Sequence, residues 1–274
     1  MKYTLLFALL FGLLFQAYPQ RIKGDMPDER ELYAQTKQMN QFFRRFNNEE
    51  DMKGIRYGEN PPRRNDELRK GYLEQLFNND PQGVPERKRD ALIQQVTTVG
   101  NPQYIEFHND GWYAEVSALF NYKGSEKPVT LYMKLEPSGL GSEWVLINVF
   151  FEPYARRFSI DTAKRNQTFM HPMSHELDFM NLRKVFDHPS DVFYYTSKDY
   201  RPDFLTIFLE EAQAGMFDFK TVTNVRFHFL QVPGWYFTVD FYNRRGYNSG
   251  WLISEATQVD EEGKEQIREL ITNN

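Results

Sequence analysis

The chain has 274 residues and a formal net charge of −5, with 41% hydrophobic and 16% aromatic residues. This composition excludes a disordered tail and a fibre, and the length allows one large domain or two of ordinary size. Cysteine is absent, which excludes disulfides, thiolate metal sites and cysteine nucleophiles. We therefore expect a globular protein with an aromatic core whose stability depends on packing alone.

The first twenty residues have the features of a secretory signal peptide. Lys2 is followed by an apolar run from Leu5 to Phe15 and then by a mixed segment around Ala17 and Gln20. The run is too short for a helix that crosses a bilayer, which needs about 20 residues. We expect cleavage after Ala17 or Gln20, and a soluble mature chain, without a membrane span, that is secreted or periplasmic.

Two short motifs occur twice in the same order. They are Gly111-Trp112-Tyr113 with Gly234-Trp235-Tyr236, and Ser142-Glu143-Trp144 with Ser249-Gly250-Trp251. This order favours an internal duplication. Chance similarity in an aromatic-rich chain is the alternative, because the spacing between the two motifs differs between the halves.

Periodicity predicts helices followed by strands in the first half. Apolar residues at helical spacing predict three helices, which begin at Pro27, near Asp66 and at Pro85. Alternating apolar residues then predict strands at Ile105 and Phe107, from Trp112 to Phe120, from Val129 to Leu135 and from Glu143 to Phe151.

The second half is predicted to repeat this plan after a linker without clear periodicity, residues 156–173. Helices are expected from Ser174 to about Phe186 and from Pro202 to Ala212, strands at Val225–Phe229, Trp235–Asn243 and around Trp251, and a final helix from Asp260. The predicted organisation is a signal peptide (1–20), a first α+β domain (21–155), the linker (156–173) and a second α+β domain (174–274).

Helices followed by a long antiparallel meander with aromatic inner positions resemble the cone-shaped nuclear transport factor 2-like fold, here in tandem. The resemblance covers most of residues 27–153 and, less completely, 174–260. It implies two similar α+β domains, each with N-terminal helices packed on a curved antiparallel sheet. That superfamily includes isomerases, dehydratases, polyketide cyclases and noncatalytic binding domains, so the fold does not select a function.

Asp240 is the catalytic candidate, because an enzyme of this fold needs an acid or base that projects into the cone. Strand alternation, however, places Asp240 opposite the apolar row of Trp235, Phe237 and Val239. A solvated strand carboxylate is therefore the competing interpretation, and no catalytic residue is assigned.

Histidines supply the candidates for metal ligands. His171 and His175 are four residues apart, but Pro172 and a predicted N-cap at Ser174 place His171 outside the helix, and no further ligand completes a site. His228 is predicted to be an exposed histidine at a sheet edge. No metal or cofactor is expected.

Aromatic rings are the remaining candidates for ligand contacts. Tyr113, Tyr194, Tyr195 and Tyr236 are predicted to form a platform for a sugar, peptide or lipid, with core packing as the alternative. Basic residues alternate with acidic ones, so nucleic acid is not an expected partner. The sequence favours an exported noncatalytic protein that binds an envelope or extracellular protein or glycan. An isomerase or dehydratase with a cone pocket, or a carbohydrate-binding protein, is the alternative.

Overall fold

The computed structural model describes residues 38–50, 54–57, 66–139, 141–170, 182–246 and 248–272. The predicted signal peptide, the start of the helix at Pro27, and His171, Ser174 and His175 lie outside the described residues.

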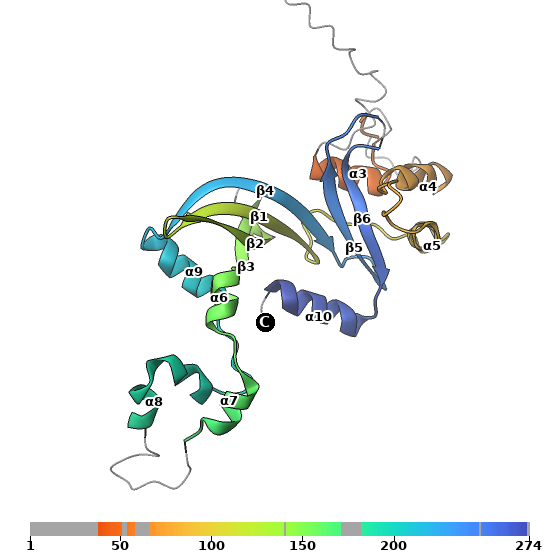
Figure 1. The fold of residues 1–274 in the computed structure, drawn as a ribbon. Helices are drawn as coiled ribbons and strands as arrows, with labels where there is room; N and C mark the ends of the chain where they lie inside the picture. Colours follow the sequence, from red (N-terminus) through yellow and green to blue (C-terminus); the bar gives the residue numbers. More distant parts are fainter. Residues whose placement is uncertain are drawn as a thin grey trace, which may run out of the picture.

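Six strands form one curved antiparallel sheet in the order β3-β2-β1-β4-β5-β6 (Figure 1). Their bounds are β1 Trp112–Tyr122, β2 Ser125–Ser138, β3 Gly141–Phe150, β4 Phe217–Phe229, β5 Trp235–Tyr242 and β6 Gly250–Gln258. The α+β class is therefore confirmed. Each half contributes a three-stranded meander, and the two meanders join where β1 pairs with β4 along its whole length. Because this pairing merges the meanders into a single sheet, the two-domain repeat is not confirmed.

The main core lies between one face of the sheet and three helices: α3 Met39–Phe46, α4 Asp66–Gln75 and α5 Glu86–Val96. Aromatic rings fill it, and the Phe229 and Phe237 rings of neighbouring strands stack with centroids 4.8 Å apart. Trp112 packs on Phe43 and Phe229. The guanidinium of Arg69, on α4, is fully buried and donates to the carbonyls of Phe46 and Val96, so it ties the three helices together.

A second core lies further along the same strands, under α6 Glu152–Arg157 and α9 Phe204–Gln213. Asp203 caps α9 by accepting from the backbone N–H groups of residues 205 and 206, as the Pro-Asp start predicts. The carboxylate of Glu211, on α9, accepts hydrogen bonds from the hydroxyls of Tyr122 and Tyr154 at 3.0 and 2.7 Å. These bonds attach α9 and α6 to β1.

The opposite face of the sheet is partly covered by the C-terminal helix α10, Glu261–Thr272 (Figure 1). Three short helices lie below the sheet in this view: α7 Thr162–Gln167, α8 Arg183–Asp187 and the 3-10 helix η3 Pro189–Tyr195, which contacts both of the others. The predicted linker thus contains α7.

Two strand predictions need correction. Residues 102–106 form no strand, because the side chain of Asn47 both donates to the carbonyl of Ile105 and accepts from its N–H. These bonds replace the partners that a neighbouring strand would supply. In addition, β4 begins at Phe217 instead of Val225. Register shifts against β1 interrupt the alternation of its first half, so periodicity alone does not mark it as a strand.

Candidate functional site

A row of polar side chains crosses the sheet on the face opposite the main core. The register places Glu115 of β1 opposite Arg226 of β4, and Arg226 opposite Asp240 of β5. Two residues along β4, His228 lies opposite Thr238. Side chains that are directly opposite have Cβ atoms about 5 Å apart, so residues distant in the sequence come into contact here.

Glu115, His228 and Tyr236 form a continuous chain of hydrogen bonds. The Nε2 atom of His228 lies 2.9 Å from Oε2 of Glu115, and Nδ1 lies 2.8 Å from the hydroxyl of Tyr236. The hydrogen bond from His228 holds the pKa of Glu115 below its ordinary value despite partial burial, whereas burial raises the pKa of Tyr236. An ionised Glu115 can only accept, so Nε2 of His228 carries a hydrogen and donates it to Glu115.

The prediction of an exposed edge histidine is wrong for His228, which is 6% exposed. Its strand, β4, lies at the centre of the sheet between β1 and β5. Sequence reasoning placed this strand at the edge of a separate domain, and the joining of the two meanders buries it.

Helix α10 covers the aromatic side chains next to the Glu115–His228–Tyr236 hydrogen bonds. Ile267 and Ile271 pack among residues that include Tyr113 and Tyr236, and the buried Nζ of Lys264 donates to the carbonyl of Val232. Tyr113 is 6% exposed. Two of the four predicted platform tyrosines therefore contribute to packing beneath α10.

The other two, Tyr194 and Tyr195, lie in η3, which contacts α7 and α8. The ammonium of Lys164 lies 5.0 Å from the centroid of the Tyr194 ring. The structure thus places the four predicted tyrosines in two separate regions. Within the described ranges, no three His, Asp or Glu side chains are grouped in a way that could hold a metal ion.

Asp240 lies beside an open pocket of about 470 Å³. The guanidinium of Arg226 binds both carboxylate oxygens of Asp240 at 2.9 Å, and this ion pair raises the pKa of Arg226. β4 pairs with β5 no further than this point. The pocket is lined by side chains of the α4–α5 connection and of β4, β5 and β6: Asn78, Asp80, Pro81, Gln82, Arg226, Asp240, Tyr242, Ser254 and Glu255.

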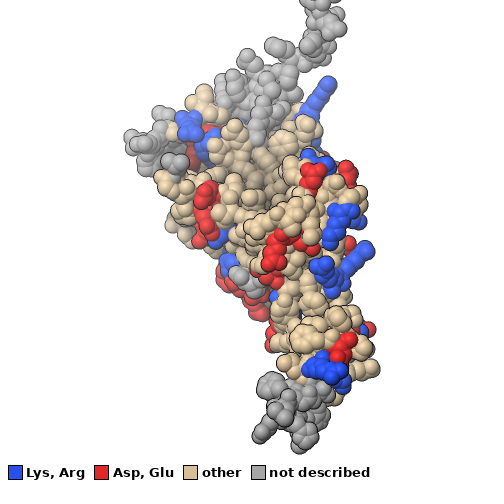
Figure 2. Space-filling view, turned by 90° about the vertical axis from the view of Figure 1, so that its left-hand side faces the viewer, with Lys and Arg blue, Asp and Glu red and all other residues tan. Residues whose placement is uncertain are grey.

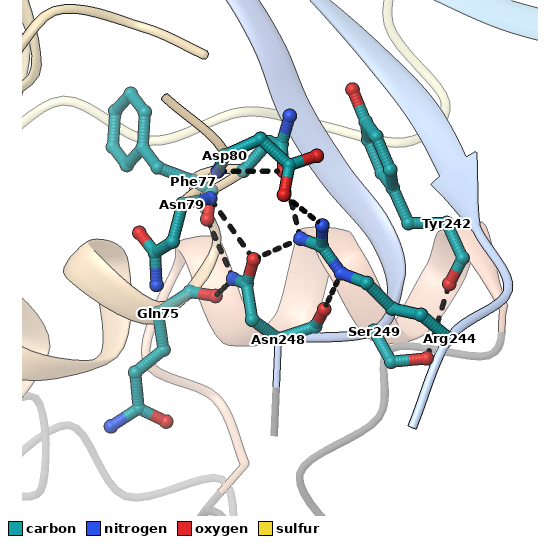
Figure 3. A network of polar contacts seen from close by, with 9 residues as sticks. Gln75, Phe77, Asn79, Asp80, Tyr242, Arg244, Asn248 and Ser249 are labelled. Atoms are coloured by element: carbon teal, nitrogen blue, oxygen red, sulfur yellow. Dashed lines mark hydrogen bonds and ion pairs between the residues drawn. The ribbon is translucent and has the colours of Figure 1, made fainter. Parts of the chain in front are cut away.

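A polar network fixes one wall of this pocket (Figure 3). Arg244, beyond the end of β5, donates to Asp80 Oδ1 at 2.5 Å and to Asn78 Oδ1 at 2.7 Å. Asn248 accepts from Arg244 and donates to the carbonyl of Phe77 at 2.7 Å. The backbone of residues 76–78 also bonds with Ile253 of β6 as a short parallel bridge. The wall and the sheet are therefore joined at several points.

The pocket offers hydrogen-bond donors, acceptors and an aromatic ring. The carboxylate of Asp80 is paired with Arg244 and that of Asp240 with Arg226. Glu255 is exposed and makes no hydrogen bond or ion pair with another described residue. Its acceptor oxygens are therefore available to a ligand, while the side-chain amide of Gln82 supplies both a donor and an acceptor.

Neither the pocket nor the face of the described residues drawn in Figure 2 carries a strong excess of positive charge. Acidic and basic side chains are interspersed over the face drawn in Figure 2, and no large patch of one sign is visible there. Three carboxylates and one guanidinium line the pocket. This balance favours a neutral or cationic ligand over an anionic one.

Arg226, Glu115 and Arg244 were missed from the sequence, although a signal for the first was present. The strands predicted at Val225–Phe229 and Trp235–Asn243 are separated by a turn at Val232-Pro233-Gly234. An antiparallel register across that turn pairs Arg226 with Asp240. Glu115 and Arg244 gave no such signal. The partner of Glu115, His228, lies in the other meander, and the partner of Arg244, Asp80, lies in the α4–α5 connection.

No family model, no curated protein and no solved structure matches this chain significantly. Within the part of the chain that the structure describes, no helix combines the length and apolar character that crossing a bilayer requires.

Proposed function

We propose that this chain is an exported, noncatalytic binding protein and that its ligand site is the pocket between residues 78–82 and strands β4–β6. The observation that carries the proposal is the bidentate Arg226–Asp240 pair in the pocket. Arg226 and Asp240 are partners of each other, so neither is a free acid or base, and Glu255, the carboxylate of the lining that is unpaired among the described residues, is exposed to solvent. Glu115, His228 and Tyr236, the groups best suited to proton transfer, do not line it.

The chemistry of the pocket favours a neutral ligand rich in hydroxyl groups, such as a glycan of the cell envelope or extracellular space. Each hydroxyl both donates and accepts, and the pocket supplies a donor and an acceptor in Gln82 and further acceptors in Glu255. The ring of Tyr242 adds an apolar surface on which a sugar ring can pack. The volume falls within the range of roughly 300–1,000 Å³ typical of small-ligand sites.

Export belongs to the same proposal and is supported by the signal-peptide pattern of the first twenty residues. An origin by duplication is supported by the two meanders, because Trp144 and Trp251 both lie in the third strand of their meander. Trp112 and Trp235 do not correspond in this way, since they open a first and a second strand. The proposed resemblance to the nuclear transport factor 2-like fold is limited to one feature, the packing of helices on a curved sheet.

The test is binding of the mature chain, expressed from residue 21, to an array of glycans, followed by calorimetry with each glycan that binds. Glu255→Gln and Tyr242→Ala are expected to weaken binding at least about tenfold, the loss of roughly 1.4 kcal/mol that one good polar or ring contact provides. Glu143→Gln, an equivalent change at an exposed position on β3, is the control and is expected to bind as the wild type does.

A silent array, or affinities that Glu255→Gln and Tyr242→Ala leave unchanged, would overturn the proposal. An enzyme would be favoured instead if the chain turned over a bound glycan and Asp240→Asn abolished this turnover while binding was retained.

A further inference from the structure

Strand β4 has a long free edge. Its full length pairs with β1, but β5 pairs only with its last four residues, Arg226–Phe229. Among the described strands, none lies beside residues 217–225 on the side away from β1, and Figure 1 shows this half of β4 along the upper rim of the curved sheet. The backbone N–H and C=O groups that point outward here are open to another strand.

Apolar side chains accompany this edge. Phe219 is 56% exposed, Val222 46% and Met216, which directly precedes the strand, 39%. The Phe219 ring rests on Phe120 with centroids 5.5 Å apart, which holds it in place next to the edge. Three exposed apolar residues within seven positions favour a surface that another protein covers.

The charges on this edge are self-complementary. Asp218 and Lys220 are two residues apart and form an ion pair of 2.5 Å, which raises the pKa of Lys220 and places both side chains on one face. In an antiparallel pairing of two identical strands about Phe219, Asp218 of each copy lies opposite Lys220 of the other. In the same register Met216 lies opposite Val222. A two-fold axis at Phe219 therefore satisfies the charges and the apolar residues together.

We propose that the free edge of β4 is an interface between two copies of this chain, which pair antiparallel about Phe219 and extend the sheet across the dimer. A lysine and strand bulges usually prevent indiscriminate pairing at an edge, and β4 has both. Lys220 favours the register in which Asp218 of the second copy lies opposite it, because the two charges then attract each other. The contact is isologous, so it closes at two subunits.

The first experiment measures the mass of the mature chain by sedimentation equilibrium over a range of concentrations. A reversible monomer–dimer equilibrium is expected. Lys220→Asp places like charges opposite each other at both symmetric contacts, so it is expected to weaken the dimer about tenfold. The control is Lys88→Asp, which makes the same charge change at an exposed position on α5 and is expected to leave the equilibrium unchanged.

The second experiment identifies the register. The double variant Asp218→Lys with Lys220→Asp restores opposite charges within its own dimer but opposes like charges in a mixed dimer with the wild type. Differently tagged wild-type and double-variant chains are therefore expected to form homodimers and few mixed dimers when co-purified. A monomer at all concentrations, a dimer insensitive to Lys220→Asp, or free mixing of the two chains would overturn the proposal. Far-ultraviolet circular dichroism of each variant verifies that the chain is folded.

Discussion

Arg226 donates two hydrogen bonds of 2.9 Å to the carboxylate of Asp240, one from Nε and one from Nη2, at the last residue pair that joins β4 to β5. The two side chains are 33% and 15% exposed. Beyond this pair β4 follows β1 while β5 follows β6. The ion pair therefore holds β4 and β5 together at the point where these two strands separate.

Removing either partner is expected to destabilise the chain, because the other charge then remains partly buried without compensation. We expect Arg226→Gln and Asp240→Asn each to lower the free energy of unfolding by about 1–2 kcal/mol, since water screens part of the interaction. The double variant is expected to show a coupling energy of about 1 kcal/mol in urea unfolding.

The comparison for this pair is Lys134 with Glu136 on β2, an ion pair whose side chains are 37% and 46% exposed. Its coupling energy is expected to be about 0.5 kcal/mol or less. Equal coupling energies in the two cycles would show that the Arg226–Asp240 pair does not hold β4 and β5 together as described.

The stability contributed by Glu115 is expected to depend on pH. Its pKa is lower in the folded chain than its ordinary value of 4.5, mainly because of the hydrogen bond from His228. A lowered carboxyl pKa stabilises the fold above the unfolded value, and this contribution is lost as the pH falls through the folded value. Glu115→Gln removes the ionisation while it keeps an acceptor oxygen.

The measurement is urea unfolding of the wild type and of Glu115→Gln from about pH 7 to about pH 3. The stability advantage of the wild type is expected to be constant above about pH 4.5 and to shrink below it. In a His228→Asn background the same comparison is expected to give a weaker dependence on pH. An advantage that grows as the pH falls would contradict the assignment.

Elements whose signal is local could be predicted from the sequence. Helix α5 after Pro85, α9 after its cap at Asp203, and α10 after Asp260 lie where the sequence predicts them. The alternation in β5 also places Asp240 on the other face of the strand from the core residues Trp235, Phe237 and Val239, as expected. These features depend on residues a few positions apart.

Features that depend on distant partners could not be predicted in this way. Nothing in the local sequence reveals that β1 pairs with β4, and this pairing turns two expected domains into one sheet and buries His228. The same pairing brings Glu115 to His228. The wall of the pocket likewise requires Arg244 to meet Asp80 across most of the chain.

The repeated Gly-Trp-Tyr motif has a backbone explanation that mutation can test. Gly111 and Gly234 precede the first residues of β1 and β5 and have φ angles of +93° and +72°, a region that costs other residues about 1–2 kcal/mol. A Cβ at Gly234 meets no atom within 4 Å, whereas a Cβ at Gly111 lies 3.2 Å from Cγ of Gln231. The side chain of Gln231 holds the loop before β1 by donating to the carbonyl of Glu106 at 2.8 Å.

Gly234→Ala is therefore expected to lower the free energy of unfolding by about 1–2 kcal/mol through backbone strain alone. Gly111→Ala is expected to cost more, because it adds the displacement of Gln231. Gly234→Asn is expected to recover part of the loss, since asparagine tolerates positive φ.

The control is Gly71, which lies inside α4 with open space around a Cβ and for which the opposite change in stability is expected. There alanine is expected to stabilise the chain by about 0.5–1 kcal/mol. Urea unfolding of the four variants tests this order, and a neutral Gly234→Ala would show that positive φ does not explain the repeated glycine.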